Sequence, residues 1–267
     1  MTPLSLILIG CTIVSTSFLS GLFGMAGGMI LLGVLLVYFD VATGMVIFSV
    51  IQFVANGWRA ALWWRFVKWR IFFVYVSGAV ISFAIMRAVA IVPSKAAVYI
   101  SLGLLPFLIE LLPARARPNI EWRGVPFLTG FLTTIIQLLT GVGGLFLDIF
   151  FQKSALDRKT TIATKAVTQT FSHVVRAVYF GSFTWLIDAV PLWLFVPAIA
   201  MSMAGTSLAA VALERMTDVG FRQWTRRVIF AVSIVLLARG VMLAIGFYSF
   251  RMVLSENRFP LVGTMRY

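Results

Sequence analysis

The sequence predicts an all-α polytopic membrane protein built from two related halves. Of its 267 residues, 61% are hydrophobic and 12% are charged, whereas soluble domains are about half apolar and about a quarter charged. Long apolar runs recur along the chain, and several approach the roughly 20 residues that a helix needs to cross a bilayer. Continuous runs favour helices over the short alternating segments of a membrane barrel. The runs cover residues 4–19, 29–39, 45–64, 71–86, 96–112, 126–139, 160–180, 191–213 and 228–250.

The net charge of +13 comes from 22 Lys or Arg residues against 9 Asp or Glu residues. In a membrane protein such residues set topology from the loops and face anionic lipids. We therefore expect the lipid bilayer, and no nucleic acid, as the partner of this charge. The single cysteine excludes an intramolecular disulfide and a cysteine-cluster metal site.

An internal repeat runs through the chain. The segment GMAGGMIL at 24–31 aligns with TGVGGLFL at 140–147, an offset of 116 residues. A second pattern follows in the same order at an offset of 117. It aligns Gln52, Asn56, Arg59 and Ala60 with Gln169, His173, Arg176 and Ala177. We predict a first repeat at 1–113, a basic cytoplasmic linker at 114–123, a second repeat at 124–250 and a C-terminal tail at 251–267.

Two topologies compete, and the basic residues discriminate between them. If each glycine segment belongs to one straight spanning helix, the loop cations divide 9 against 9 between the two sides. If each glycine segment is instead the tip of a re-entrant hairpin, every half has three full crossings and the second half is inverted. The division then becomes 13 against 5, which fits the positive-inside rule. We therefore expect inverted repeats, each a glycine-broken hairpin plus three transmembrane helices.

The glycine segments have two interpretations. Small residues allow membrane helices to pack closely. Alternatively, Gly27, Gly28, Gly143 and Gly144 lie where a helix breaks inside the membrane and turns backbone N–H groups toward an anion. The equivalent double glycines in both halves favour the break. They do not form a nucleotide loop, because no Gly-Lys-Ser/Thr follows them.

Polar residues share one helix face in each half. Gln52, Asn56 and Arg59 are spaced i, i+4, i+7, and so are Gln169, His173 and Arg176, with Lys165 one turn before them. A charged side chain inside a membrane-spanning helix costs free energy and normally serves a function. Arg59 could instead reach the headgroups. Because the pattern is repeated, we expect the two arginines to present planar donor groups to an oxyanion.

Two further residues on or near this face have their own expectations. We expect His173 to be neutral and to be a candidate ligand beside Arg176. Asp148 replaces Leu32 of the first half, and it either pairs with Lys165 or carries a coupling proton. Pairing is the interpretation we favour.

These motifs resemble the sulfite exporter TauE/SafE family, also described as toluene-sulfonate uptake permeases. The matching features are the two glycine segments, the helices with Arg59-Ala60 and Arg176-Ala177, and the duplicated layout, over roughly residues 4–250. Neither hairpin has the family's usual proline after the glycines. The resemblance implies transport of sulfite, sulfonates, sulfoacetate or related anions across a bacterial inner membrane.

The sequence therefore predicts a secondary transporter for a small anion, with a coupling proton or ion and a homo-oligomer left open. An anion-selective channel and a non-transporting scaffold subunit are the alternatives. An intramembrane enzyme is the least favoured class, since one His and one Cys offer little for catalysis. No cofactor is expected.

Overall fold

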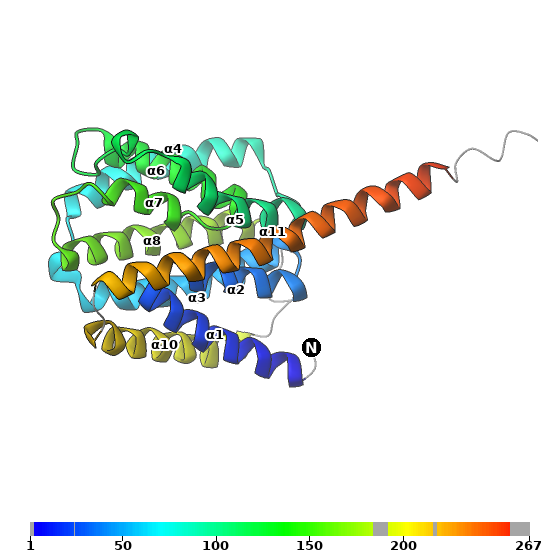
Figure 1. Ribbon diagram of the computed structural model, residues 1–267, viewed down its shortest axis with the longest axis horizontal. Helices are drawn as coiled ribbons and strands as arrows, with labels where there is room; N and C mark the ends of the chain where they lie inside the picture. Colours follow the sequence, from blue (N-terminus) through cyan, green and yellow to red (C-terminus); the bar gives the residue numbers. More distant parts are fainter. Residues whose placement is uncertain (1–2, 24, 184–191, 216–217, 257–267) are drawn as a thin grey trace, which may run out of the picture.

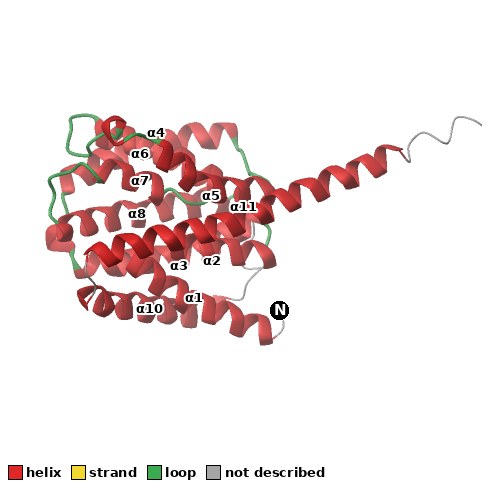
Figure 2. Ribbon diagram, in the orientation of Figure 1, coloured by secondary structure: helices red, strands yellow, loops and turns green. Residues whose placement is uncertain are grey.

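The computed structural model describes residues 3–23, 25–183, 192–215 and 218–256 of the chain (Figure 1). In this described part the secondary structure is helical, joined by short loops (Figure 2). The helices are α1 (Pro3–Phe23), α2 (Met25–Tyr38), α3 (Val41–Leu62), α4 (Trp69–Val89), α5 (Lys95–Leu111), α6 (Val125–Thr140), α7 (Gly144–Phe151), α8 (Arg158–Gly181), α10 (Phe195–Arg215) and α11 (Asp218–Glu256), with 3-10 turns η1 (Trp64–Phe66), η2 (Ala114–Ala116) and η3 (Leu192–Leu194).

Four of the described helices contain a segment long and apolar enough to cross a membrane: Val41–Leu62, Trp69–Val89, Phe195–Ala212 and Arg226–Gly246. Shorter apolar segments lie in α1, α2 and α6. Large apolar side chains such as Phe73, Val196 and Val235 are exposed on the outside of the bundle. This distribution fits a chain whose surroundings are lipid.

Helices α3 and α8 pack side by side at the centre of the bundle (Figure 1). Their contacts run in opposite directions along the two helices. Ser49 meets Arg176 and Asn56 meets His173, and beyond the end of α3 the backbone of Lys68 meets Thr164. The residue number rises on α3 while it falls on α8, so the two helices are antiparallel.

The three next most extensive helix pairs also join the N-terminal and C-terminal halves. They are α1 with α10, α4 with α6, and α5 with α11. Glycines bring these helices together: a Cβ added at Gly78 would lie 2.1 Å from Phe127 O, and one added at Gly130 would lie 2.0 Å from Tyr75 O. Helices α5 and α11 are antiparallel as well, since Gly103 faces Leu237 while Gly240 faces Ile100.

The two glycine segments each lie between a pair of packed helices. Gly27 on α2 faces Thr16 and Ser20 on α1, while Gly24 lies outside the described residues. In the second half, α6 ends at Thr140 and α7 begins at Gly144. Gly141 caps α6 at φ +84°, a left-handed conformation that only glycine adopts without strain. The chain can therefore reverse here within a few residues.

The predicted C-terminal tail begins inside a helix. Helix α11 continues through residue 251 to Glu256, and its C-terminal part extends beyond the bundle (Figure 1). Residues 257–267 lie outside the described part of the chain.

Helix α8 begins with a side-chain cap at an exposed loop. Asp157 accepts a hydrogen bond from the Thr160 backbone N–H at 3.0 Å and from its hydroxyl at 2.6 Å. These bonds, the hydroxyl bond first, hold the pKa of the Asp157 carboxyl below its ordinary value. The cap satisfies a backbone donor that the first turn of a helix leaves without a partner.

Replacing Asp157 with alanine is expected to lower the thermal unfolding midpoint by about 2–4 °C at neutral pH, because the cap is lost. Asp157→Asn keeps an accepting oxygen and should stay near the wild type. The ionised cap stabilises the fold above the unfolded-state pKa, and this contribution is lost as the pH falls through the lowered folded-state pKa. Thermal melts should therefore show the difference between wild type and Asp157→Ala shrinking in acid, and a constant difference would contradict the assignment.

Candidate functional site

Arg176 lies at the centre of the bundle with 1% of its surface exposed. Its Nε donates to Ser49 Oγ at 2.9 Å, and one terminal nitrogen donates to the Gly141 carbonyl oxygen. The other terminal nitrogen donates to His173 Nδ1 at 2.5 Å. The guanidinium carbon also lies 4.4 Å from the centre of the Phe48 ring, within the range of a cation–π contact. The glycine break, α3 and α8 thus hold one buried cation together.

The hydrogen bonds around His173 fix its protonation. Arg176 is an obligate donor, so His173 Nδ1 accepts and the ring proton sits on Nε2. His173 Nε2 lies 3.2 Å from Asn56 Nδ2, and that same amide nitrogen donates to Gln52 O at 2.9 Å. Turning the amide would point its oxygen at Nε2 but would break the bond to Gln52 O. The surroundings of His173 therefore contain more hydrogen-bond donors than acceptors. His173 is neutral, because its Nδ1 accepts a hydrogen bond and carries no proton.

A small cavity lies beside Arg176, between the glycine segment of the second half and α8. Its free space for a water-sized sphere is about 10 Å³, room for roughly one water molecule. Thr133, Gln137, Gly141, Val142, Gly143, Gly144, Leu147, Gln169, Ser172, His173, Arg176 and Phe48 line it. The cavity therefore brings together five of the residues that the sequence predicted: Gly143, Gly144, Gln169, His173 and Arg176.

The predicted residues of the first half do not line this cavity. Gln52 is 5% exposed, and its Nε2 would lie 2.7 Å from a Cβ at Gly28. Asn56 faces His173, as described above. Arg59 Nη2 donates to Ser20 O at 3.2 Å. The described contacts thus join Asn56 to His173 and give Arg59 and Arg176 different partners.

Lys165 lies outside the cavity lining and forms an ion pair. Its Nζ is 2.5 Å from Asp148 Oδ1, as the sequence predicted for these two residues. The pair joins α8 to α7 one helical turn from Gln169.

Sequence reasoning missed several polar residues of the site. Ser49, one turn before Gln52 on the same face of α3, accepts from Arg176. Gln137 and Thr133 precede Gly141 at spacings of four and eight residues. A search for polar residues at helical spacing from Gln52 and from Gly141 would have found all three, because the surrounding runs are apolar.

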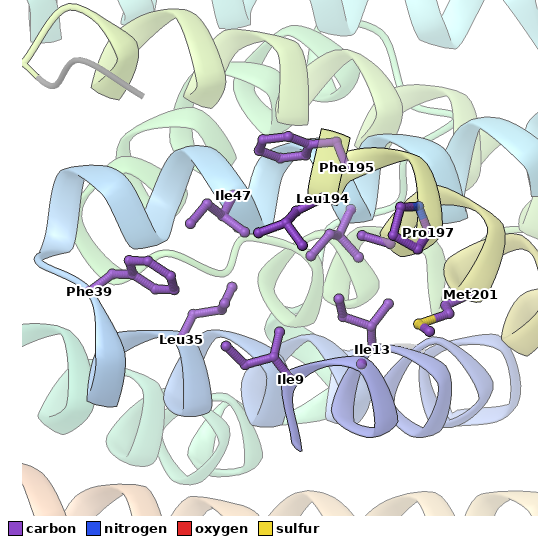
Figure 3. A pocket seen from close by; sticks show the side chains of 12 residues that line it. Ile9, Ile13, Leu35, Phe39, Ile47, Leu194, Phe195, Pro197 and Met201 are labelled. Atoms are coloured by element: carbon purple, nitrogen blue, oxygen red, sulfur yellow. The ribbon is translucent and has the colours of Figure 1, made fainter. Parts of the chain in front are cut away.

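A larger cavity lies elsewhere and has a different character (Figure 3). It offers about 110 Å³ to a water-sized sphere and is lined by apolar residues of α1, α2, α3, η3 and α10, including Ile13, Leu35 and Met201. A lining without polar donors cannot replace the hydration of an anion. Of these two cavities, the smaller one is therefore the candidate site for an anion.

The smaller cavity has the properties of a binding site for an acceptor. It contains a buried cation, side-chain donors and the first turn of α7, whose backbone N–H groups have no partner within the helix. The described ion pairs are Lys165 with Asp148 and Arg226 with Glu110, so neither neutralises Arg176. A buried cation without an acidic partner is costly and attracts a negative charge.

These features define the class: a polytopic helical membrane protein with a polar site inside an apolar bundle. A model of the sulfite exporter TauE/SafE family matches residues 8–249. The chain belongs to this family of membrane transporters. No curated protein matches the chain, and no solved structure does.

Proposed function

We propose that this protein is a secondary transporter that moves a small sulfur oxyanion or organosulfonate across the bacterial inner membrane. The observation that supports it most is Arg176, 1% exposed, with no acidic partner among the described ion pairs. An isolated buried cation costs several kcal/mol. A bound oxyanion would offset that cost and would give the surplus donors an acceptor.

The anion would lie against Arg176, the N–H groups of Gly143 and Gly144, and the side chains of Gln169 and His173. A tetrahedral or pyramidal oxyanion can accept from several donors at once, and guanidinium groups suit it by geometry. His173 takes part as a neutral donor through Nε2. The family match, a sulfite exporter description over residues 8–249, supports sulfur oxyanions as the substrate class.

Inverted repeats with re-entrant hairpins are the topology we propose. In support, the equivalent helices α3 and α8 are antiparallel, and the aligned residues Asn56 and His173 meet. Antiparallel packing of equivalent helices is the arrangement that a twofold axis in the membrane plane would produce. Gly28 lies beside Gln52, near the middle of α3, which fits a hairpin tip deep in the bilayer. Such repeats with broken helices place substrate near the midplane in other transporters.

Alternating access would follow from exchange between the two halves. The cavity holds about one water, so an oxyanion requires the surrounding helices to move apart. In an inverted repeat the two halves exchange conformations when the protein changes its open side. Arg59, the counterpart of Arg176, would then contact the anion together with Gln52, Asn56, Gly27 and Gly28 in the opposite state.

Purified protein in proteoliposomes is expected to carry sulfite or a simple sulfonate with flux that saturates as the concentration rises. The same anion should raise the thermal unfolding midpoint in detergent, because ligand binding stabilises the folded state. Carboxylates of similar size are the control ligands. Ohmic, non-saturating currents would replace the carrier with a channel. The absence of both flux and thermal shift over a broad anion panel would favour a scaffold subunit.

A further inference from the structure

The Asp148–Lys165 ion pair connects the two elements that enclose the cavity. Asp148 lies on α7, one turn after Gly144, and Lys165 lies on α8. The Nζ–Oδ1 distance is 2.5 Å, and the two side chains are 32% and 24% exposed. The Asp148 Oδ1 atom itself is enclosed and makes no other hydrogen bond among the described residues. The pair is therefore held inside the protein but can still be reached.

The pair lies at one end of the cavity. Leu147, the neighbour of Asp148, and Gln169, one turn after Lys165, both belong to the cavity lining. The adjacent Thr164 accepts a hydrogen bond from the Lys68 backbone N–H at 3.0 Å. This bond places Lys165 at the level of the α3–α4 connection, where Arg65 and Lys68 are exposed. Along α8 the pair thus lies between the cavity and this exposed basic connection, which is the basic face of the protein.

The corresponding positions in the first half are apolar. Alignment of the two halves pairs Asp148 with Leu32 and Lys165 with Phe48. Leu32 is 0% exposed and Phe48 is 1% exposed. Leu32 packs toward Gly141 and Phe48 covers Arg176. These two positions are thus buried and apolar in the first half, while in the second half they hold a partly exposed pair of opposite charges.

We propose that Lys165 is a separate anion site at the entrance from the basic face, occupied in this structure by the Asp148 carboxylate, which an entering oxyanion displaces. A carboxylate and a sulfur oxyanion present the same chemistry to an ammonium group, a negatively charged oxygen acceptor. Exchange of one for the other opens the contact between α7 and α8 without leaving Lys165 unpaired. The proposal rests on the proposed transport function.

Asp148→Asn removes the competing charge and retains the shape of the side chain. We expect the KM for sulfite, measured in proteoliposomes, to fall about threefold to fivefold. The coupling energy of a partly exposed ion pair corresponds to a change in affinity of about that factor. Lys165→Met should raise the KM by a similar factor, and Lys165→Arg should restore it. In the Lys165→Met background Asp148→Asn should have no effect, because the two substitutions act on one interaction.

The matched control is Glu110→Gln. It removes one carboxylate from the other described ion pair, with Arg226 at 2.8 Å on α5 and α11. This pair lies on the exposed surface, and neither residue lines the cavity. The KM of Glu110→Gln should equal that of the wild type. The proposal is overturned if Asp148→Asn behaves like Glu110→Gln, or if it lowers the KM equally with and without Lys165.

A second measurement does not depend on transport. Cys11 is the single cysteine of the chain, so a Cys11→Ala background allows Asp148→Cys to be labelled alone. The ratio of the labelling rate of an anionic methanethiosulfonate that bears a sulfonate to that of a cationic one should exceed the ratio for a free thiol in solution. Adding Lys165→Met should lower the anionic-to-cationic rate ratio about threefold to fivefold. An unchanged ratio would overturn the entrance site.

The two measurements separate the two proposals. A wild type without sulfite flux, but with a labelling ratio that depends on Lys165, would refute the transport function and support an anion site at Lys165. Saturating flux, together with an anionic-to-cationic labelling ratio that is unchanged by Lys165→Met, would support the transporter and refute the entrance site.

Discussion

Arg176→Ala is expected to lower kcat/KM for anion transport about a hundredfold, since it removes the buried positive charge and the charge-assisted hydrogen bonds that its remaining N–H groups donate to the substrate. The ligand-induced rise in the unfolding midpoint should disappear in the same variant. Arg176→Lys keeps the charge but cannot reach Ser49, Gly141 and His173 together, so it should recover only part of the activity. Flux assays in proteoliposomes, at matched protein incorporation, measure both effects.

Arg87→Ala is the matched control. Arg87 is exposed, donates to Ser182 Oγ and lies 5.5 Å from the Phe183 ring centre, away from the cavity lining. Its removal should leave flux near the wild-type level. A well-folded Arg176→Ala variant that transports at the wild-type rate would falsify the proposed site.

The sequence made Arg176 predictable but not its surroundings. The repeated spacing with Gln169 and His173 placed three polar residues on one helix face, and the cavity contains all three. The two arginines were expected to bind one anion together, whereas the structure gives them different partners. Periodicity within one helix says which residues share a face. It does not say how an antiparallel partner helix is aligned, and that alignment brings Asn56, not Arg59, to His173.

The second large effect is expected at the contact between α4 and α6. Gly130→Val should lower the free energy of unfolding by about 3 kcal/mol, because the added atoms would overlap the backbone of α4 and force the helices apart. The nearest atom to a Cβ at this position is the Tyr75 carbonyl oxygen, at 2.0 Å. A backbone atom within a helix cannot move aside as a flexible side chain can. Thermal unfolding in detergent and the yield of monodisperse protein are the measurements.

Gly181→Ala provides the comparison. No atom lies within 4 Å of a Cβ added at Gly181, so the variant should stay within about 0.5 kcal/mol of the wild type. Equal melting behaviour of Gly130→Val and the wild type would mean that α4 and α6 are farther apart than the structure places them.

The helical class and the apolar runs were predictable from composition, because a bilayer restricts an apolar chain to few solutions. The helix break at 141–143 was visible as well, since glycine is needed at the φ of +84° that Gly141 adopts. The pairing of α4 with α6 was not visible. Gly78 and Gly130 stand alone in their apolar runs, and a single glycine does not identify the helix that will pack against it.

The helix pairs between the two halves determine when the protein can assemble during its synthesis. Helix α1 packs on α10, α4 on α6, α3 on α8 and α5 on α11, so each of these pairs joins an early helix to a late one. A nascent chain that has inserted only its first five helices has close-packing surfaces without their partners. Assembly therefore needs helices of the second half, and the two halves expressed as separate polypeptides should accumulate only when they are produced together.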